Sequence, residues 1–477
     1  MGPASGPEES EQANGGVSVS GTNDECGMTN VELPKGWAKT TLEDIARDVT
    51  YGYTAKSNRT SGGAKMLRIT DIQDNRVDWS QVPFCAISAT DKVKYLLKKW
   101  DLVFARTGAT VGKSFLIQDN VTDAVFASYL IRVRCIDNGM TSYLRYFFNS
   151  PAYWNQITDF SAGIGQPNVN GSKLKGLVIP LAPLAEQKRI ADKLEAVLGR
   201  VDACRARLNR VPAFLKRFRQ SVLAGATSGG LTAEWRMTNG VNDEWEETQI
   251  QHVANVGTGS TPLRSNTAFF APKGTPWVTS AATSKKLVTK SEEFVTDAAI
   301  KAHRLKKYPV GTLLVAMYDE GKTRGQVTEL GIEATINQAC AAIVVDESII
   351  TKRFVKFSLE ANYLEMRELA EGGNQPNLNL SKIKEFPIGL PTLPEQQEIV
   401  RRVEDLYAFA DRIEVRLAIA QKTVERLTPA TLAKAFRGEL VPQDPNDEPA
   451  SALLERLKSA EPAPSTTKTR RKRSATV

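Results

Sequence analysis

The chain has 477 residues, which is more than one hydrophobic core normally serves, so two or more domains are expected. Hydrophobic residues make up 41% and charged residues 24%, which excludes collagen-like and wholly disordered chains. The net charge of +8 permits a polyanionic partner without requiring one.

Cysteine and histidine usage excludes several kinds of site. The five cysteines are scattered and form no CxxC motif, so we expect free thiols in a reducing cytoplasm and neither a disulfide framework nor a zinc site. Two histidines, His252 and His303, are too few for histidine metal clusters or Ser-His-Asp machinery. The sequence starts without a signal pattern, and no apolar run approaches the roughly 20 residues of a membrane helix. These patterns predict a soluble protein that is not exported.

The composition changes along the chain. Residues 1–28 are rich in Gly, Ser and Glu and are predicted to form a disordered N-terminal tail. Residues 29–183 contain short β-like runs such as 102–104 and 129–133, which indicate a first globular domain.

A long helical stretch follows at 184–226. Pro180 and Pro183 precede it, and Glu186 stands in its first turn, where the helix dipole favours an acid. Its apolar residues alternate at spacings of four and three, the 3.5-residue period of a coiled coil. They are Ile190, Leu194, Val197, Val201, Cys204, Leu208, Val211, Leu215, Phe218 and Val222. We expect Pro212 to kink this helix or to mark a break in it.

The second half repeats this order. A Gly-rich linker at 227–240 leads into a second globular domain at 241–392 and a second helical stretch at 393–437. The matching apolar seam is Ile399, Val403, Leu406, Ala410, Ile413, Leu417, Ala420, Val424 and Leu427. Residues 438–477 are Pro-rich and basic and are predicted to be a largely disordered tail.

The repeat has an offset of 209 residues. The Gln-Pro-Asn run at 166–168 recurs at 375–377, and Glu186-Gln187 recurs as Glu395-Gln396. The same offset links the two helical seams, and it links Gly112-Lys113 with Gly321-Lys322. Two copies, each a globular domain followed by a helix, therefore fill the chain.

We accordingly expect an α+β protein with a pseudo-twofold internal repeat, in which two similar globular α/β domains are separated by two long helices. The seams could pack against their own domains or against each other, and the duplicated register favours an antiparallel coiled coil. Residues 190–222 give a spacer of roughly 50 Å at about 1.5 Å per residue, which exceeds one turn of B-DNA, about 34 Å.

Catalytic motifs are incomplete. Residues 108–114 look like a P-loop, but the required first glycine is replaced by Thr107, and by Ala316 in the second copy. Strand-like residues follow, so no helix N-terminus would hold phosphate, and a glycine turn that carries a cation explains the run better. No methyltransferase tetrapeptide or glycine-rich cofactor loop occurs. Asp71 and Asp74 fit a solvated loop better than a nuclease cluster.

Several motifs carry a family resemblance, namely Leu33-Pro34-Lys35-Gly36-Trp37 and Glu244-Trp245 at the domain starts, the runs at 256–262 and 335–340, the two Gln-Pro-Asn runs, and the two Glu-Gln helix starts. Together with the layout, they resemble the specificity (S) subunits of type I restriction-modification enzymes over about residues 29–440. The resemblance implies that each globular part is a target recognition domain and that the helices pair as a spacer. It also implies a cytoplasmic bacterial or archaeal protein that binds a bipartite, gapped target in double-stranded DNA.

The resemblance further implies two adenine methyltransferase (M) subunits as partners, with restriction/translocase (R) subunits joining them. Catalysis would belong to those partners, so no catalytic residue, cofactor or metal is expected in this chain. S-adenosylmethionine, ATP and Mg²⁺ are expected on the partner subunits. A stand-alone DNA-binding protein and a coiled-coil scaffold for other proteins remain alternatives.

Two readers of different half-sites should share a scaffold and differ where bases are read, so the divergent polar loops are the expected DNA contacts. In domain one these are Tyr51, Tyr53, Lys56, Asn58, Arg59, Arg68, Arg106, Thr107, Lys113, Ser128 and Tyr129. In domain two they are Thr258, Ser260, Arg264, Asn266, Ser280, Lys285, Lys286, Tyr318, Lys322, Arg324 and Gln338.

Four amides occur in both copies, namely Gln166, Asn168, Gln375 and Asn377. Such side chains suit adenine, but their presence in both copies favours a turn, a phosphate contact or a methyltransferase contact. The first helix also carries ten cations against four acids over 184–224. This charge could follow DNA phosphates, bind a partner subunit or remain a solvated face.

Overall fold

The computed structural model describes residues 32–59, 62–73, 75–108, 110–161, 168–241, 244–317, 325–362 and 378–459. These fall into two compact units. The first contains the residues up to Ala206 and those from Gln421 onward, and the second contains Arg207–Ala420. Each unit holds one globular domain and part of the long helices, so the boundaries of the units fall inside the helices.

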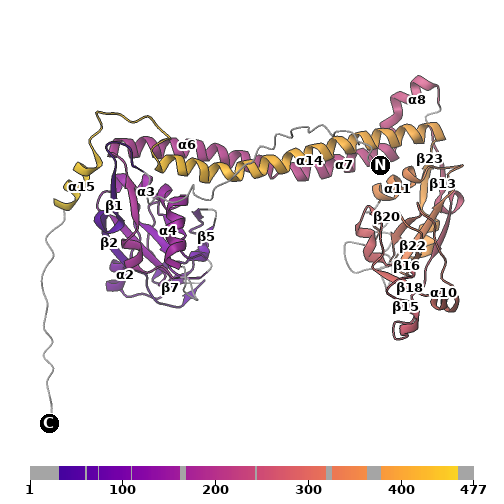
Figure 1. Ribbon diagram of the computed structural model, residues 1–477, viewed down its shortest axis with the longest axis horizontal. Coiled ribbons are helices and arrows are strands. Elements are labelled where there is room, and N and C mark those ends of the chain that lie inside the picture. The colour runs from indigo at the N-terminus through magenta and orange to yellow at the C-terminus, as the bar shows by residue number, and fades with distance from the viewer. Residues whose placement is uncertain are drawn as a thin grey trace, which may run out of the picture. The chain divides into compact units, whose positions relative to one another are not determined.

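Domain one alternates short strands with short helices (Figure 1). Its strands are β1 (Ala38–Thr41), β2 (Ala46–Tyr51), β3 (Ser57–Asn58), β4 (Ala64–Leu67), β5 (Ile72–Gln73), β6 (Arg76–Val77), β7 (Phe84–Cys85), β8 (Leu102–Ala105), β9 (Ser114–Leu116), β10 (Ala124–Phe126), β11 (Leu130–Cys135) and β12 (Val178–Leu181). Its helices are α1 (Leu42–Ile45), η1 (Ile69–Asp71), α2 (Ala89–Tyr95), η2 (Asn138–Met140), α3 (Thr141–Phe147), α4 (Pro151–Ser161) and α5 (Gly171–Lys175).

The strand pairing of domain one places the ends of β2 and β8 next to the start of β11. The sheet of order β2-β11-β8-β9 is antiparallel, and in the sheet of order β10-β4-β7-β3 the strands β10 and β4 run parallel. β1 pairs with β12, which joins the start of the domain to the strand before the first long helix. The ends of β2 and β8 and the start of β11 are therefore neighbours.

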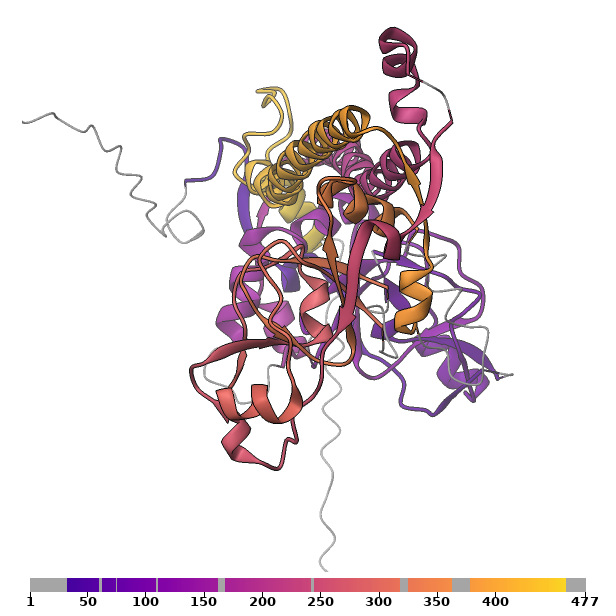
Figure 2. The same ribbon diagram turned by 90° about the vertical axis from the view of Figure 1, so that its right-hand side faces the viewer.

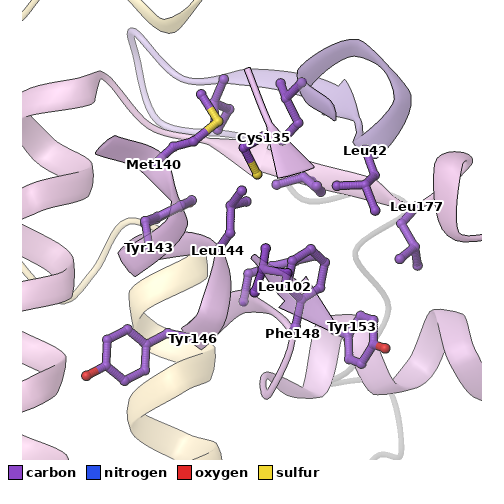
Figure 3. Packing of buried hydrophobic residues seen from close by; sticks show 14 of the residues in the cluster. Leu42, Leu102, Cys135, Met140, Tyr143, Leu144, Tyr146, Phe148, Tyr153 and Leu177 are labelled. Atoms are coloured by element: carbon purple, nitrogen blue, oxygen red, sulfur yellow. The ribbon is translucent and has the colours of Figure 1, made fainter. Parts of the chain in front are cut away.

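The core of domain one is apolar and aromatic. Leu102, Cys135 and Leu144 lie among Tyr143, Phe148 and Tyr153 in one buried cluster, as Figure 3 shows. Phe104 meets Phe148 edge to face, with 4.8 Å between ring centroids. Burying a side chain of this size contributes about 1.5–3 kcal/mol, so the cluster fixes the strands that carry the polar edge.

Domain two repeats the arrangement. Its strands are β13 (Glu246–Gln249), β14 (Ala254–Thr258), β15 (Phe270–Ala271), β16 (Thr275–Val278), β17 (Leu287–Val288), β18 (Glu293–Val295), β19 (Leu313–Ala316), β20 (Val327–Leu330), β21 (Thr335–Ile336), β22 (Cys340–Val345) and β23 (Pro387–Leu390). Its helices are α9 (Ile250–Val253), η4 (Thr267–Phe269), η5 (Ser280–Ser284), α10 (Asp297–His303), α11 (Lys352–Ala361) and α13 (Leu380–Lys384). The sheet of order β14-β22-β19-β20-β17 corresponds to β2-β11-β8-β9, and β13-β23 corresponds to β1-β12. The predicted α+β class with two similar domains is confirmed.

The predicted constant offset is wrong inside the domains. The amide of Gly112 donates to the carbonyl of Ala105 at 2.8 Å, and the amide of Gly325 donates to that of Ala316 at 2.9 Å. Both glycines have a left-handed backbone, with φ of +82° and +79°. Gly112 therefore corresponds to Gly325, 213 residues later, because the second copy has a longer connection between these two strands.

This correction changes one predicted equivalence. Lys113 corresponds to Gln326, because their carbonyls accept the matching amides of Ala105 and Ala316 at 2.8 and 3.2 Å. Gly321-Lys322, which the constant offset pairs with Gly112-Lys113, lies outside the described residues. The expected strands after both glycine turns are confirmed as β9 and β20.

The first helical stretch is two helices, α6 (Leu184–Leu208) and α7 (Val211–Thr227), and the second is α14 (Leu393–Phe436). Pro212 stands in the first turn of α7, so the predicted break is confirmed. In the first unit, Ile190 near the start of α6 shares a buried cluster with Leu432 and Phe436 near the end of α14. Those segments therefore pack antiparallel.

The same pairing occurs in the second unit (Figures 1 and 2), where α7 lies along α14. Val222 and Ala226 at the end of α7 share a cluster with Ile399 and Val403 at the start of α14. Both clusters also contain the core of the adjoining domain. The seam therefore packs against the partner helix and against its own domain, not against one of them alone.

Two predicted seam residues are exposed. Cys204 is exposed, and Leu427 keeps 42% of its surface exposed. Cys204 lies in the last turn before the break between α6 and α7, and Leu427 lies two residues before Pro429, which stands inside α14. The helix ends a few residues after Cys204, whereas Pro429 lies inside the continuous α14, where proline removes a main-chain hydrogen-bond donor.

The Glu-Gln helix starts fasten each domain to its helix. The indole of Trp37 donates to the buried carboxylate of Glu186 at 3.0 Å, and the indole of Trp245 donates to that of Glu395 at 3.2 Å. The residues that carry the family resemblance thus meet in pairs, and their first role is structural.

The segments after α7 and α14 also differ from the sequence predictions. The predicted linker forms η3 (Gly230–Thr232) and α8 (Ala233–Asn239). The predicted disordered tail contains α15 (Ala450–Ser459), so that prediction is wrong for 438–459. The reason is apolar burial, because Leu453 and Leu457 on α15 pack into the core of domain one.

Candidate functional site

Seven predicted contact residues of domain one meet at the edge formed by the ends of β2 and β8 and the start of β11. We call this set the domain-one surface; it consists of Tyr51, Tyr53, Arg106, Thr107, Ser128, Tyr129 and Asn168. Main-chain hydrogen bonds set their places, since Ser128 donates to Tyr53 and Arg106 donates to Tyr129, both at 3.0 Å. Thr107 forms an antiparallel bridge with Asn168, whose buried Oδ1 has no hydrogen-bond partner. Tyr129 is 65% exposed, which opens the surface to a ligand.

Arg106 lies at the centre of this surface in a fixed geometry. Its guanidinium carbon is 5.1 Å from the ring centroid of Tyr51, within cation–π range. The Tyr51 hydroxyl in turn accepts the amide of Gly171 at 2.7 Å. The carbonyl of Arg106 accepts the amide of Val169 at 3.0 Å. Among the described residues, no carboxylate forms an ion pair with Arg106, so its positive charge is not neutralised there.

Two other predicted cations of domain one have partners within the domain. Arg68 donates to both carboxylate oxygens of Asp71, at 2.6 and 3.1 Å, and this pairing raises the pKa of Arg68. Lys113 donates from Nζ to the carbonyl of Ile72 at 3.2 Å. The ion pair neutralises Arg68, whereas the hydrogen bond to a neutral carbonyl restrains Lys113 beside η1 without neutralising its charge.

The remaining residues predicted for domain one lie elsewhere. Lys56, Asn58 and Arg59 are exposed around β3, at the opposite edge of its sheet from β10. Within the domain-one surface, the backbone of Tyr53 lies at the edge, but its ring packs on Tyr95 with 5.3 Å between ring centroids.

Domain two forms a corresponding edge with different chemistry. We call Thr258, Ser260, Asn337 and Gln338 the domain-two surface. Thr258 donates from its hydroxyl to the carbonyl of Cys340 at 2.9 Å, and Ser260 donates from its amide to Ile336 at 3.2 Å. Burial raises the pKa of Tyr308, whose hydroxyl supports this edge by donating to the carbonyl of Thr258 at 3.1 Å.

Met317 occupies the main-chain position that Arg106 has in domain one, but its side chain is buried in the core of domain two and is only 2% exposed. Its amide donates to the carbonyl of Ala339 at 2.8 Å, as that of Arg106 donates to Tyr129. At these two positions domain two therefore has the uncharged side chains of Met317 and Ala339, where domain one has the guanidinium of Arg106 and the exposed ring of Tyr129. The two surfaces share a backbone and differ in their side chains.

Asn337 is a polar residue of this edge that was not among the predicted contact residues. The side-chain Oδ1 of Asn337 is buried without a hydrogen-bond partner, and its main-chain amide donates to the carbonyl of Val278 at 3.0 Å. Asn337 lies beside the exposed Gln338, and two adjacent amides in the 335–340 motif were the signal that could have found it.

Other predicted residues of domain two are held by their own domain. Arg264 forms a two-point ion pair with Glu293 at 2.6 and 3.1 Å and stacks on Trp277 at 5.0 Å. The Asn266 side chain accepts the amide of Ala268 at 3.1 Å and so caps η4. Neither side chain joins the domain-two surface through a hydrogen bond among these described contacts.

The η5 region carries three more predicted residues. The carbonyl of Ser280 accepts the hydroxyl of Thr283 at 2.7 Å. Lys285 lies 3.8 Å from Glu292, and Lys286 is exposed. Six predicted residues lie outside the described residues; these are Gln166, Tyr318, Lys322, Arg324, Gln375 and Asn377.

The helical cations are partly neutralised. Arg189 pairs with Asp447 at 2.6 Å, and Arg219 pairs with Asp411 and Glu414 at 2.5 and 2.6 Å. These pairs join each helix to a segment far away in the sequence. For Arg189 and Arg219 a structural role therefore replaces the solvated face.

The described residues contain no group of three or more His, Cys, Asp and Glu side chains placed to hold a metal ion. Cys85, Cys135, Cys204 and Cys340 are free thiols, as predicted, and Cys26 lies outside the described residues. No helix in the described part of the chain has the length and apolar character needed to cross a membrane.

Comparisons with known proteins match both copies. The family model for the type I restriction modification DNA specificity domain matches residues 34–213 and 242–419. The type I restriction enzyme StySPI specificity subunit of Salmonella potsdam is 29% identical over 467 residues, covering 94% of this chain and 100% of that protein. The EcoDI specificity subunit of Escherichia coli is 31% identical over 363 residues, covering 68% of this chain and 79% of that one.

A solved structure has the same fold. The HsdS subunit from Thermoanaerobacter tengcongensis gives a TM-score of 0.61 at 18% sequence identity, covering 86% of this chain and 99% of that one.

Proposed function

Because the chain belongs to the family of type I restriction modification DNA specificity domains, we propose that it is the DNA-recognition subunit of a type I restriction-modification complex. The observation that carries this proposal is the match of the family model to both copies, which together form most of the described chain. The chain's role is recognition and not catalysis.

Each domain reads one half of a bipartite DNA target. This follows from the contrast between a shared scaffold and divergent surfaces, since Arg106 and Tyr129 are replaced by Met317 and Ala339 at the same main-chain positions. Two readers with identical side chains would select a repeated half-site, whereas different side chains select different bases. The spacer length that the helices predict stays a prediction.

Catalysis belongs to partner subunits in this proposal. Two adenine methyltransferase subunits dock on the chain, and restriction/translocase subunits join through them. S-adenosylmethionine, ATP and Mg²⁺ bind to those partners, and the complex acts in the cytoplasm, where the DNA is.

The test is to produce the chain with its methyltransferase subunit in cells without other adenine methylation and to map the methylated bases. We expect methyl-adenine confined to one gapped motif with two different halves. A chain that binds one motif tightly without a methyltransferase would indicate a stand-alone DNA-binding protein. A well-formed complex without DNA affinity would indicate a protein scaffold and would contradict the proposal.

A further inference from the structure

We propose that Arg106 reads a guanine in the half-site of domain one and that Tyr51 is the residue that positions it. This inference rests on the proposed function and deepens it by assigning one base to one side chain. It comes from a comparison of the cations that surround the two surfaces.

The first step is availability of charge. Arg68 is neutralised by Asp71 and Arg264 by Glu293, each through two hydrogen bonds to one carboxylate. A guanidinium in such a pair must lose its carboxylate before it can bind a base edge. Arg106 has no such partner among the described residues, so its positive charge is available to an acceptor on DNA.

The second step is preorganisation. The Arg106 guanidinium stacks over the Tyr51 ring at 5.1 Å, and the Tyr51 hydroxyl is tied to the amide of Gly171 at 2.7 Å. The backbone of Arg106 is fixed on both sides by hydrogen bonds of 3.0 Å to Tyr129 and Val169. The side chain is half-buried, which limits its rotamers further.

The third step is the chemistry that this geometry suits. A planar guanidinium presents parallel N–H donors that match O6 and N7 of guanine in the major groove. Phosphate contacts need only a nearby positive charge and are made equally well by mobile exposed cations such as Lys56. A guanidinium held on a tyrosine ring therefore fits base reading better than phosphate binding.

The equivalent position of domain two is Met317, which cannot donate a hydrogen bond. Reading of a guanine by a guanidinium at this position is thus a property of domain one alone. The side chain of Met317 is also buried in the core of domain two, so it offers no contact to a base there.

The test uses the complex of the chain with its methyltransferase subunit and the sequence of the methylated motif as the readout. We expect Arg106→Ala to make one guanine position of one half-site degenerate, with discrimination lower by roughly 5- to 150-fold. The other half-site stays unchanged. Tyr51→Leu should relax the same position to a smaller extent, an effect that a purely structural role of Tyr51 would not confine to one base.

Two control variants and one substitute complete the test. Gln338→Ala, an exposed residue of the domain-two surface, should leave the half-site of domain one unchanged. Lys56→Ala should reduce methylation of all sequences alike or have no effect. If Arg106→Ala fails to fold, Arg106→Lys keeps the charge and removes the planar fork, and it should relax the same base.

Each outcome decides between the assignments. A guanine requirement that survives in Arg106→Ala, or a uniform loss over all sequences, overturns the assignment of Arg106 to a base. A wild-type complex that methylates no gapped motif contradicts the proposed function, and with it this assignment.

Discussion

In both domains the same hydrogen bond attaches the globular part to the start of a long helix, and we call this contact the joint; the residues around it differ between the two domains. In both, a tryptophan near the start of the domain donates to a buried glutamate at the start of a long helix, Trp37 to Glu186 and Trp245 to Glu395. In both, a glycine with a left-handed backbone follows the helix that pairs with the one carrying this glutamate, namely Gly229 after α7 with φ of +75° and Gly438 after α14 with φ of +76°. The chain then returns to the domain, through η3 and α8 in one case and through α15 in the other.

The residues that surround the buried glutamate differ between the two domains. In domain two, Glu395 also accepts from Thr232 and Arg236, both at 2.7 Å, and the ion-paired side chains of Glu395 and Arg236 are 1% and 7% exposed. In domain one, Oε1 of Glu186 is buried without a hydrogen-bond partner, and the returning helix contributes Leu453 and Leu457 to an apolar core. The repeat preserves the backbone path and the carboxylate, but among the described residues only the copy in domain two pairs the buried carboxylate with a cation.

The largest effect is expected from breaking the joint of domain two. Arg236→Met should lower the free energy of unfolding by about 3–5 kcal/mol, because it leaves the Glu395 carboxylate buried without its cation. Urea unfolding measures the loss, and hydrogen exchange at the start of α14 locates it. The control is Met237→Ala on the same helix, where the side chain is 79% exposed. A loss below about 1 kcal/mol would show that the ion pair is not what holds this joint.

In domain one, the corresponding test removes an apolar side chain of the returning helix α15 from the core. Leu453→Ala should destabilise that domain by about 2–5 kcal/mol, since it removes a buried side chain and leaves a cavity. Glu455→Ala, an exposed neighbour on α15, should change stability by less than about 0.5 kcal/mol. Equal stability of the Leu453 variant and the wild type in urea would mean that α15 does not complete the core.

The smallest effect concerns the unpartnered oxygen of Glu186. Burial raises the pKa of this carboxyl above its ordinary 4.5, so the folded chain binds the proton more tightly than the unfolded chain does. Its contribution to stability is therefore present at low pH and is lost as pH rises through the raised pKa. Glu186→Gln does not titrate, so its advantage over the wild type should grow as pH rises from 4.5 through the raised pKa of Glu186.

Urea unfolding of the variant and the wild type at several pH values over this range measures whether the stability advantage of Glu186→Gln grows with pH. Glu195→Gln, on the same helix with a 72% exposed side chain, should show no comparable growth. An advantage of Glu186→Gln that is independent of pH, or that shrinks as pH rises, would contradict the buried-charge account of domain one.

Local patterns predicted the scaffold well. The 3.5-residue seam, the prolines before each helix and the break at Pro212 depend on neighbours within a few residues, so the sequence is enough to place them. The helix α15 was missed because the Pro-rich, charged composition around it masks Leu453 and Leu457, whose burial depends on a domain at the other end of the chain.

The surfaces were predictable only in part. Polarity selected Arg106 and Arg264 equally, yet Arg264 is neutralised by Glu293, 29 residues away, and Arg106 is held on Tyr51, 55 residues away. Such pairings are set by strand order and cannot be derived from composition. The same reason explains why a constant offset paired Lys113 with the wrong residue.

The most direct test of the central claim, that each domain reads its own half-site, is a domain exchange. Residues 246–390, from the start of β13 to the end of β23, would be replaced by the corresponding segment of a relative with a different target, and the methylated motif would be mapped in the complex. The account predicts that one half of the motif changes to that of the relative while the other half stays. A motif that changes in both halves, or in neither, would contradict it.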